Sequence, residues 1–215
     1  SGGIARDGKI HWSQPEILLY DVNPKIRMSY PDLIEQDGRY WITETQKTIA
    51  RVHEIDKGLL EGLWSQGDRN SAAREGLVLE LGPEQLRPGE VELPEALDVD
   101  ESGGLSLDFW IRLDDLAPGQ VLLDSRTPEA GGLALSTAEN GTIRIDLGDG
   151  KAKASWDCDP GVLQAGKLHH VAVIVDAGPG IISFLVDGQI CDGGDARDQG
   201  WGRYGEPLGD VRGSG

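Results

Sequence analysis

Short apolar runs, closed by turn signals at intervals of about 8 to 12 residues, constrain the fold of this chain more than any other feature. The clearest turns are Asp37-Gly38, Asn140-Gly141 and Asp187-Gly188, residue pairs that suit the positive φ values of tight hairpins. No convincing helix of ten residues interrupts the runs after residue 76. The pattern predicts an all-β protein.

The second part of the chain, residues 76–215, is predicted to form a two-sheet sandwich or jelly roll. Its expected strands are Leu77–Leu81, Leu105–Leu113, Gln120–Ser125, Leu133–Ser136, Thr142–Leu147, Ala152–Trp156, His169–Asp176 and Ile181–Val186.

The first part, residues 1–60, is predicted to form a separate antiparallel unit, with strands at 16–21, 32–36, 39–44 and 48–55. A sheet of this size is marginal alone, so we expect it to belong to a larger array or to lie against the rest of the chain. Residues 61–75 are assigned to a linker. Two glycines within residues 57–64 limit any helix there to a single turn.

Charge narrows the possible partners. The chain holds 37 acidic and 20 basic side chains, a net charge of −17, which argues against nucleic acids and anionic membranes as partners. No apolar run approaches the roughly 18 residues needed to span a bilayer. We expect a secreted or periplasmic protein, with any export signal removed or lying upstream.

Residues 76–215 hold three characteristic stretches in order: an aromatic-Trp strand (105–113), a His-His-Val strand (167–176) and a closing Val-Asp-Gly hairpin (181–188). Two further strands, 120–125 and 132–135, lie between the first two. In this order they resemble the laminin-G-like, concanavalin A-like jelly-roll module. The family usually adds one or two further strands, so we expect the domain to be truncated at its C-terminal end.

The first part of the chain holds the Asp37-Gly38 turn and three notable stretches, residues 12–16, 27–33 and 41–44. Together they resemble the last blade of a sialidase-type (BNR-repeat) β-propeller. A propeller needs four or more blades, so this chain cannot close one alone. The tandem order is similar to large secreted glycoside hydrolases that degrade polysaccharides. It implies an upstream propeller as a partner of the jelly roll within the same protein.

The sialidase resemblance implies three catalytic positions in the full-length enzyme. Tyr30 matches the nucleophile, Arg27 lies near the position of the substrate acid group, and Glu44 matches the residue that supports a substrate-binding arginine. The alternative is that Tyr30 packs or lines the cleft and that Arg27 and Glu44 are strand-edge charges. This chain alone is expected to be catalytically silent.

Six Trp against two Phe weakly favour a carbohydrate-facing protein, because exposed indoles stack on sugar rings. The expected sugar-binding group is Trp156, Trp201, Arg203 and Tyr204; the alternative is that these tryptophans are core. Trp12, Trp41 and Trp110 are interpreted as core residues.

Cys158 and Cys191 are the only cysteines. A disulfide that stabilises the fold by about 3 kcal/mol is expected in a secreted protein, and two buried thiols in a cytosolic one. His169 and His170 are neighbours on a strand and face opposite sides, so they cannot share one metal ion. No metal site is assigned. Calcium is the one cofactor considered, at the acidic stretches 98–101, 157–159 and 192–195, which are otherwise solvated loops.

The sequence therefore predicts the C-terminal part of a secreted sialidase-like glycoside hydrolase, whose jelly roll binds glycan or braces the propeller. The alternative function is a structural or adhesive jelly roll without a ligand. A hydrolase site within the jelly roll itself is disfavoured, because the paired acidic strand typical of such enzymes is missing.

Overall fold

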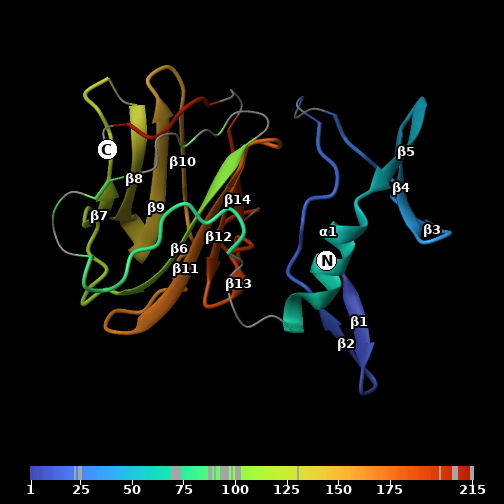
Figure 1. Cartoon of the computed structure of the whole chain (residues 1–215), viewed down its shortest axis with the longest axis horizontal. Helices are drawn as coiled ribbons and strands as arrows, with labels where there is room; N and C mark the ends of the chain where they lie inside the picture. The colour runs from blue at the N-terminus through green and yellow to red at the C-terminus, as the bar shows by residue number, and fades with distance from the viewer. Residues whose placement is uncertain are drawn as a thin grey trace. The chain divides into compact units, whose positions relative to one another are not determined.

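The structure is a computed structural model that describes residues 1–21, 23, 26–68, 74–86, 89, 91–92, 97, 99, 103–129, 131–198, 200–204 and 208–213. It divides into two compact units, Ser1–Arg74 (unit 1) and Glu75–Gly215 (unit 2), each described here by itself. The helices and strands are labelled in Figure 1. Among the described residues, no helix is long and apolar enough to cross a membrane.

A three-stranded antiparallel sheet in the order β3-β4-β5 is the main element of unit 1. The strands are β3 (Leu33–Gln36), β4 (Arg39–Gln46) and β5 (Ile49–Ile55). Asp37 and Gly38 join β3 to β4 with φ values of 54° and 75°, which confirms the predicted hairpin.

Two elements of unit 1 differ from the sequence prediction. A separate hairpin of β1 (Gly3–Arg6) and β2 (Lys9–Trp12) precedes the sheet. The helix α1 (Lys57–Ser65) exceeds the single turn expected and runs into the 3₁₀ turn η1 (Gln66–Asp68), so residues 61–68 are helical rather than linker. Residues 69–73 of the predicted linker lie outside the described residues.

Helix α1 forms despite its glycines because it is capped and packed. The Asp56 carboxylate accepts a hydrogen bond from the Gly58 amide at 2.7 Å, and Leu60 and Leu63 are buried against Ile42 and Ile55 of the sheet. This cluster also takes up Leu18, Leu19, Tyr40 and Trp64.

The strand predicted over residues 16–21 is wrong. The segment forms no strand, and its two leucines, Leu18 and Leu19, pack against the buried cluster of unit 1. A propeller blade has four strands, whereas the described sheet of unit 1 has three, extended at its edge by the single Ser29–Thr45 bridge. The blade assignment is not confirmed.

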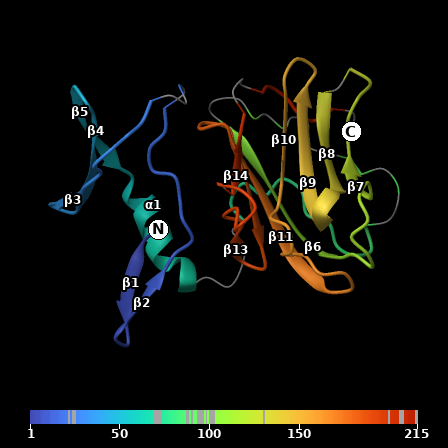
Figure 2. The same cartoon turned by 180° about the vertical axis from the view of Figure 1, so that it is seen from behind.

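Unit 2 is a sandwich of two antiparallel sheets (Figures 1 and 2). The four-stranded sheet has the order β10-β9-β8-β7, and the five-stranded sheet the order β13-β12-β11-β6, with β14 paired to β12. The first sheet comprises β7 (Val121–Asp124), β8 (Gly131–Ala138), the 3₁₀ turn η2 (Glu139–Gly141), β9 (Thr142–Asp149) and β10 (Lys153–Asp157). The second comprises β6 (Gly104–Arg112), β11 (Leu168–Asp176), β12 (Ile181–Val186), β13 (Gln189–Ile190) and β14 (Trp201–Arg203).

This architecture confirms the predicted all-β jelly roll. Seven of the eight predicted strands are present as β6 to β12, while β13 and β14 were not predicted. The strand expected over 77–81 is wrong: these residues form no strand, and Val78 is 73% exposed.

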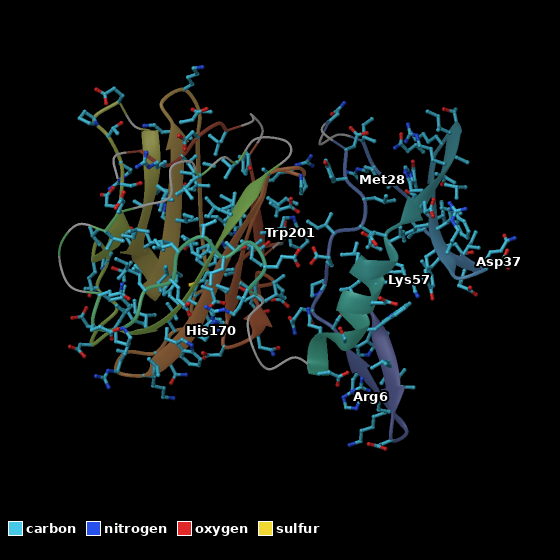
Figure 3. All side chains as sticks on the ribbon, viewed as in Figure 1. Arg6, Met28, Asp37, Lys57, His170 and Trp201 are labelled. Atoms are coloured by element: carbon cyan, nitrogen blue, oxygen red, sulfur yellow. The ribbon has the colours of Figure 1, made fainter. Side chains whose placement is uncertain are left out.

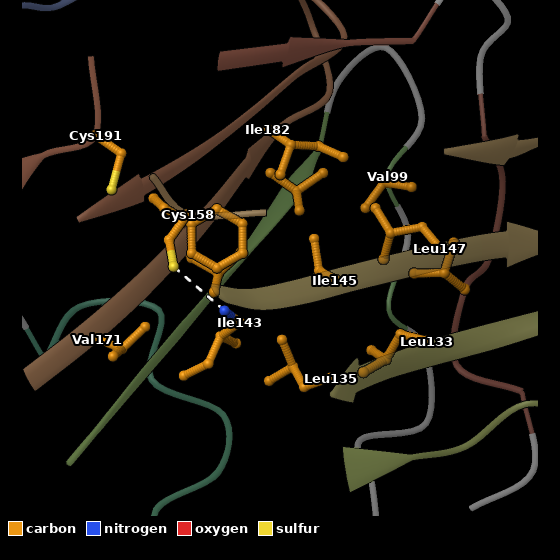
Figure 4. Close-up of a cluster of buried hydrophobic side chains, with 14 of the residues drawn as sticks. Val99, Leu133, Leu135, Ile143, Ile145, Leu147, Cys158, Val171, Ile182 and Cys191 are labelled. Carbon is orange, nitrogen blue, oxygen red and sulfur yellow. Dashed lines mark hydrogen bonds between the residues drawn. The ribbon is translucent and has the colours of Figure 1, made fainter. Parts of the chain in front are cut away.

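The core of unit 2 lies between the two sheets, and β9 and β11 contribute to it by alternation. Alternate residues of β11 (Val171, Val173, Val175) and of β9 (Ile143, Ile145, Leu147) are buried and meet in one cluster with Phe184. Figure 4 labels Val171, Ile143, Ile145 and Leu147 of this cluster. The intervening side chains of both sheets therefore form two outer faces.

Candidate functional site

Two exposed indoles share the outer face of the five-stranded sheet. Trp110 of β6 lies opposite His170 of β11, and Trp201 of β14 lies opposite Ser183 of β12. Ser183 in turn lies opposite Ile174, four residues from His170, so alternation places both indoles on the same face. Trp110 is 64% exposed and Trp201 38%. Figure 3 labels His170 and Trp201 on this sheet.

Polar groups surround Trp110. The ring centroids of Trp110 and His170 are 5.1 Å apart, with the ring planes at 44°. His170 Nε2 lies 3.0 Å from Asp108 Oδ1, and because a carboxylate only accepts, the imidazole donates through Nε2. Arg112 is exposed two residues further along β6. An exposed indole beside an imidazole, a carboxylate and a guanidinium offers both an apolar face and hydrogen-bonding groups.

The interpretation of Trp110 as a core residue was wrong. Leu105, Leu107, Phe109 and Ile111 point to the core of unit 2, and Trp110 falls out of phase with them. That phase is visible in the sequence and was the available signal. Trp12 is also exposed, to 68%, whereas Trp41 is half-buried beneath the Arg39 guanidinium.

His169 points into unit 2 and is fully hydrogen-bonded. Its Nε2 accepts from the Gln164 amide at 3.0 Å, so Nδ1 carries the proton that it donates to Asp187 Oδ2 at 2.8 Å. This hydrogen bond from His169, with a second from the His170 amide, holds the pKa of Asp187 below its usual range. The two histidines therefore face opposite sides of the sheet, as alternation predicts.

The four residues expected to bind sugar do not share one surface. In β14, Trp201 and Arg203 point outward, while Gly202 between them is buried. Trp156 and Tyr204 are half-buried and pack on the core cluster. The Tyr204 hydroxyl is buried and has no hydrogen-bond partner among the described residues.

Trp156 is held by its neighbours rather than presented to solvent. The Arg197 guanidinium lies 4.4 Å from its ring centroid, and its indole Nε1 donates to the Gly200 carbonyl at 3.2 Å. A Cβ on Gly202 would lie 2.5 Å from the ring, which shows how closely β14 packs there. Trp156 thus positions β14, and only Trp201 and Arg203 of the predicted group lie on the outer face.

In the structure Cys158 and Cys191 are free, buried thiols. Of the two states considered from the sequence, a disulfide and a pair of buried thiols, this is the second. Cys158 Sγ accepts a hydrogen bond from the Ile143 amide at 3.2 Å. Burial raises the pKa of Cys158 to about 12 and also raises that of Cys191.

Three acids of the stretches considered for calcium, Asp157, Asp159 and Asp192, have partners within the protein. Asp157 and Asp159 pair with Arg197, and Asp192 accepts from the Gly194 amide at 2.9 Å. Asp98, Asp100 and Glu101 lie outside the described residues. In the part of the chain that is described, no group of three or more His, Cys, Asp or Glu side chains is placed to hold a metal ion.

The three positions taken from the sialidase resemblance are not brought together. Tyr30 is 85% exposed with a φ of 53°, Arg27 is exposed, and Glu44 is 1% exposed. Ser29 pairs with Thr45, so Tyr30 follows the edge of β4 close to Glu44 in register, yet no hydrogen bond joins their side chains among the described contacts.

Glu44 is a buried ion-pair residue and not a strand-edge charge. Its Oε1 accepts from Arg51 Nη1 at 2.8 Å and lies 3.7 Å from His53 Nε2. Arg51 lies directly opposite Glu44 on β5, which explains the contact.

The outer face of the four-stranded sheet carries a polar groove of about 360 Å³, lined in part by Ser136, Asn140, Arg144, Asp146 and Asp157. Its one cation is internally paired: Arg144 donates to Asp146 at 3.1 Å and to Ser155 at 2.9 Å. The lining contains no aromatic side chain, so the groove lacks a stacking surface.

A family model described as the concanavalin A-like lectin/glucanases superfamily, of laminin G type, matches residues 88–208. No curated protein matches the chain. The matched range covers most of unit 2 and more than half of the chain, and it does not reach unit 1. The chain therefore belongs to the concanavalin A-like lectin/glucanase superfamily through its jelly-roll unit.

Proposed function

We propose that unit 2 is a carbohydrate-binding module and that an extended glycan binds on the outer face of the five-stranded sheet. Trp110 carries this proposal: it is 64% exposed on a strand whose other large apolar side chains point to the core. Exposed apolar surface of this kind, next to polar side chains, is typical of ligand sites.

This face offers a sugar both a stacking surface and hydrogen-bonding groups. The indole of Trp110 offers a flat apolar surface to a sugar ring, and Asp108, His170 and Arg112 lie beside it to bond hydroxyl groups. From strand spacing and rise, Trp201 lies about 20 Å away across the sheet. Two platforms at this separation suit a chain of sugars better than a single ring.

The negative charge of the chain favours uncharged glycans as ligands. A net charge of −17 repels sulfated and other polyanionic polysaccharides, so the proposed ligand is an uncharged glycan.

The test is a glycan array followed by calorimetric titration of the full chain with the neutral oligosaccharides that bind. We expect Trp110→Ala to weaken binding about tenfold and Trp201→Ala by a smaller factor. Trp12→Ala is the matched control, because Trp12 is an equally exposed indole in unit 1, and it should leave binding unchanged. Binding that survives Trp110→Ala, or no binding to any neutral glycan, would overturn the proposal.

A structural or adhesive module without a ligand is the second candidate, favoured by the exposed apolar side chains of Leu168 and Ile174 on the same face. It predicts no heat with any glycan, with or without calcium.

The wider assignment, an exported sialidase-like glycoside hydrolase with the propeller upstream, stays a prediction. Its support in unit 1 is Glu44, a buried carboxylate that holds the Arg51 guanidinium. We expect no release of product from a fluorogenic sialoside by this chain. A longer chain that includes the upstream residues should release it, and a Tyr30→Phe change there should abolish the release.

A further inference from the structure

Cys158 and Cys191 are neighbours at one end of the core cluster of unit 2 (Figure 4). Asp159, the residue after Cys158, accepts a hydrogen bond from the amide of Gly193, two residues after Cys191, at 2.9 Å. A bridge between the two cysteines needs their side chains to turn toward each other until the sulfurs are about 2.05 Å apart.

The backbone around the two cysteines is fixed by contacts that do not involve sulfur. Asp159 Oδ2 accepts from the Gly193 amide at 2.9 Å, and Arg197 binds both Asp157 and Asp159. The Cys158 amide donates to the Ile143 carbonyl at 3.0 Å, and the Cys191 amide to the Phe184 carbonyl at 2.8 Å. The two segments are therefore held next to each other before any bond forms between the sulfurs.

We propose that Cys158 and Cys191 are a disulfide-forming pair that joins the end of β10 to the segment after β13 when the chain folds in the presence of a disulfide oxidant. With glutathione disulfide, one cysteine thiolate attacks a glutathione sulfur, giving a mixed disulfide and releasing one glutathione. The second thiolate attacks the protein sulfur of that mixed disulfide and releases the second glutathione. The two cysteines lose two protons and two electrons, and both appear in the two glutathione thiols.

The folded environment determines when the bridge forms. Cys158 is fully buried and Cys191 is 3% exposed, and burial keeps both in the unreactive thiol form at neutral pH. The bridge therefore forms during folding, while the cysteines are accessible, and forms slowly in a chain that is already folded.

In the test, the full reduced chain is refolded from denaturant in one of two buffers. The oxidising buffer contains glutathione disulfide and glutathione, and the reducing buffer contains dithiothreitol. After refolding in the oxidising buffer, the intact mass should show the loss of two hydrogens, and peptide mapping should recover a Cys158–Cys191 cross-link. The midpoint of thermal unfolding of unit 2 should rise by about 10 °C relative to the reduced chain, because the bridge closes the loop of residues 158–191.

Two controls complete the design. The double variant Cys158→Ala with Cys191→Ala should show no difference between the two refolding buffers. The folded reduced chain, placed in the oxidising buffer without denaturant, should gain the cross-link much more slowly. Two reactive thiols in the denatured product after oxidative refolding would overturn the proposal, and this readout on the natural sequence decides the matter even where the double variant does not fold.

Discussion

The guanidinium of Arg197 lies 4.4 Å from the centroid of the Trp156 ring, and the same group binds Asp157 and Asp159. One arginine thus joins the segment that follows β13 to the end of β10. It also covers the indole against which Gly202 of β14 packs. The position of Trp201 on the outer face therefore depends on a contact in the interior of unit 2.

Replacing Arg197 is expected to destabilise unit 2 strongly. Asp159 is 7% exposed, and Arg197→Ala leaves its carboxylate buried without a counter-charge, which lowers the free energy of unfolding by about 3 kcal/mol. Urea unfolding at neutral pH measures the change. Arg126→Ala is the control, because Arg126 and Asp124 form an ion pair with side chains 48% and 34% exposed, and its loss costs less than about 1 kcal/mol. Equal losses in the two variants would contradict the prediction.

Truncation should destabilise unit 2 far more at Phe184 than at Trp110. Phe184 is fully buried in the core cluster, so Phe184→Ala should lower the free energy of unfolding by about 4 kcal/mol. Trp110→Ala, at a side chain mostly in solvent, should change it by less than about 1 kcal/mol. Chemical denaturation of both variants measures the difference. A large loss of stability in Trp110→Ala would show that its indole supports the fold and would weaken its assignment to a ligand site.

Alternation and turn chemistry were sufficient to predict most of the fold. The period-two pattern of β6, with Leu107 and Phe109 facing inward, and the positive-φ turn at Asp187-Gly188 are local properties that a sequence displays directly. The strand predicted over 77–81 failed because an apolar run forms a strand only where a neighbour completes its hydrogen bonds, and such partners are not visible in a single run.

The candidate site was less accessible from sequence, because it depends on register. Trp110 meets His170 only since β6 and β11 pair with those residues opposite each other, although they are 60 positions apart. The same holds for Trp156, whose partner Arg197 comes from a segment without strand signals. The phase of Trp110 within its strand, by contrast, is a local property of the sequence and predicts an outward-facing indole.

Asp149 should give unit 2 a stability that depends on pH. Its carboxylate accepts hydrogen bonds from the amides of Ala152, Lys151 and Gly209, and these bonds, Ala152 first, hold its pKa below the usual range. A depressed pKa in the folded state stabilises above the unfolded value of about 3.9, and the contribution is lost as pH falls through the folded pKa.

Asp149→Asn should therefore lower the free energy of unfolding by about 2 kcal/mol at pH 7, with the difference from the natural chain shrinking below about pH 4. Urea unfolding across the acid range measures this. Asp195→Asn, at an exposed acid of the same unit, controls for the change in net charge and should show no such trend. A loss of equal size at pH 7 and pH 3 would contradict the assignment.

Gly202 tests how tightly β14 packs on the body of unit 2. A Cβ at this position would meet the Trp156 ring at 2.5 Å, so Gly202→Ala forces either β14 or the indole to move. We expect the free energy of unfolding to fall by about 2 kcal/mol and glycan affinity to fall with it, because Trp201 directly precedes Gly202 in β14. Gly131→Ala is the matched control, since a Cβ there finds only ordinary contacts at 3.7 Å. If Gly202→Ala is as stable as the control and binds glycan as the natural chain does, β14 does not depend on the Trp156 contact for its position.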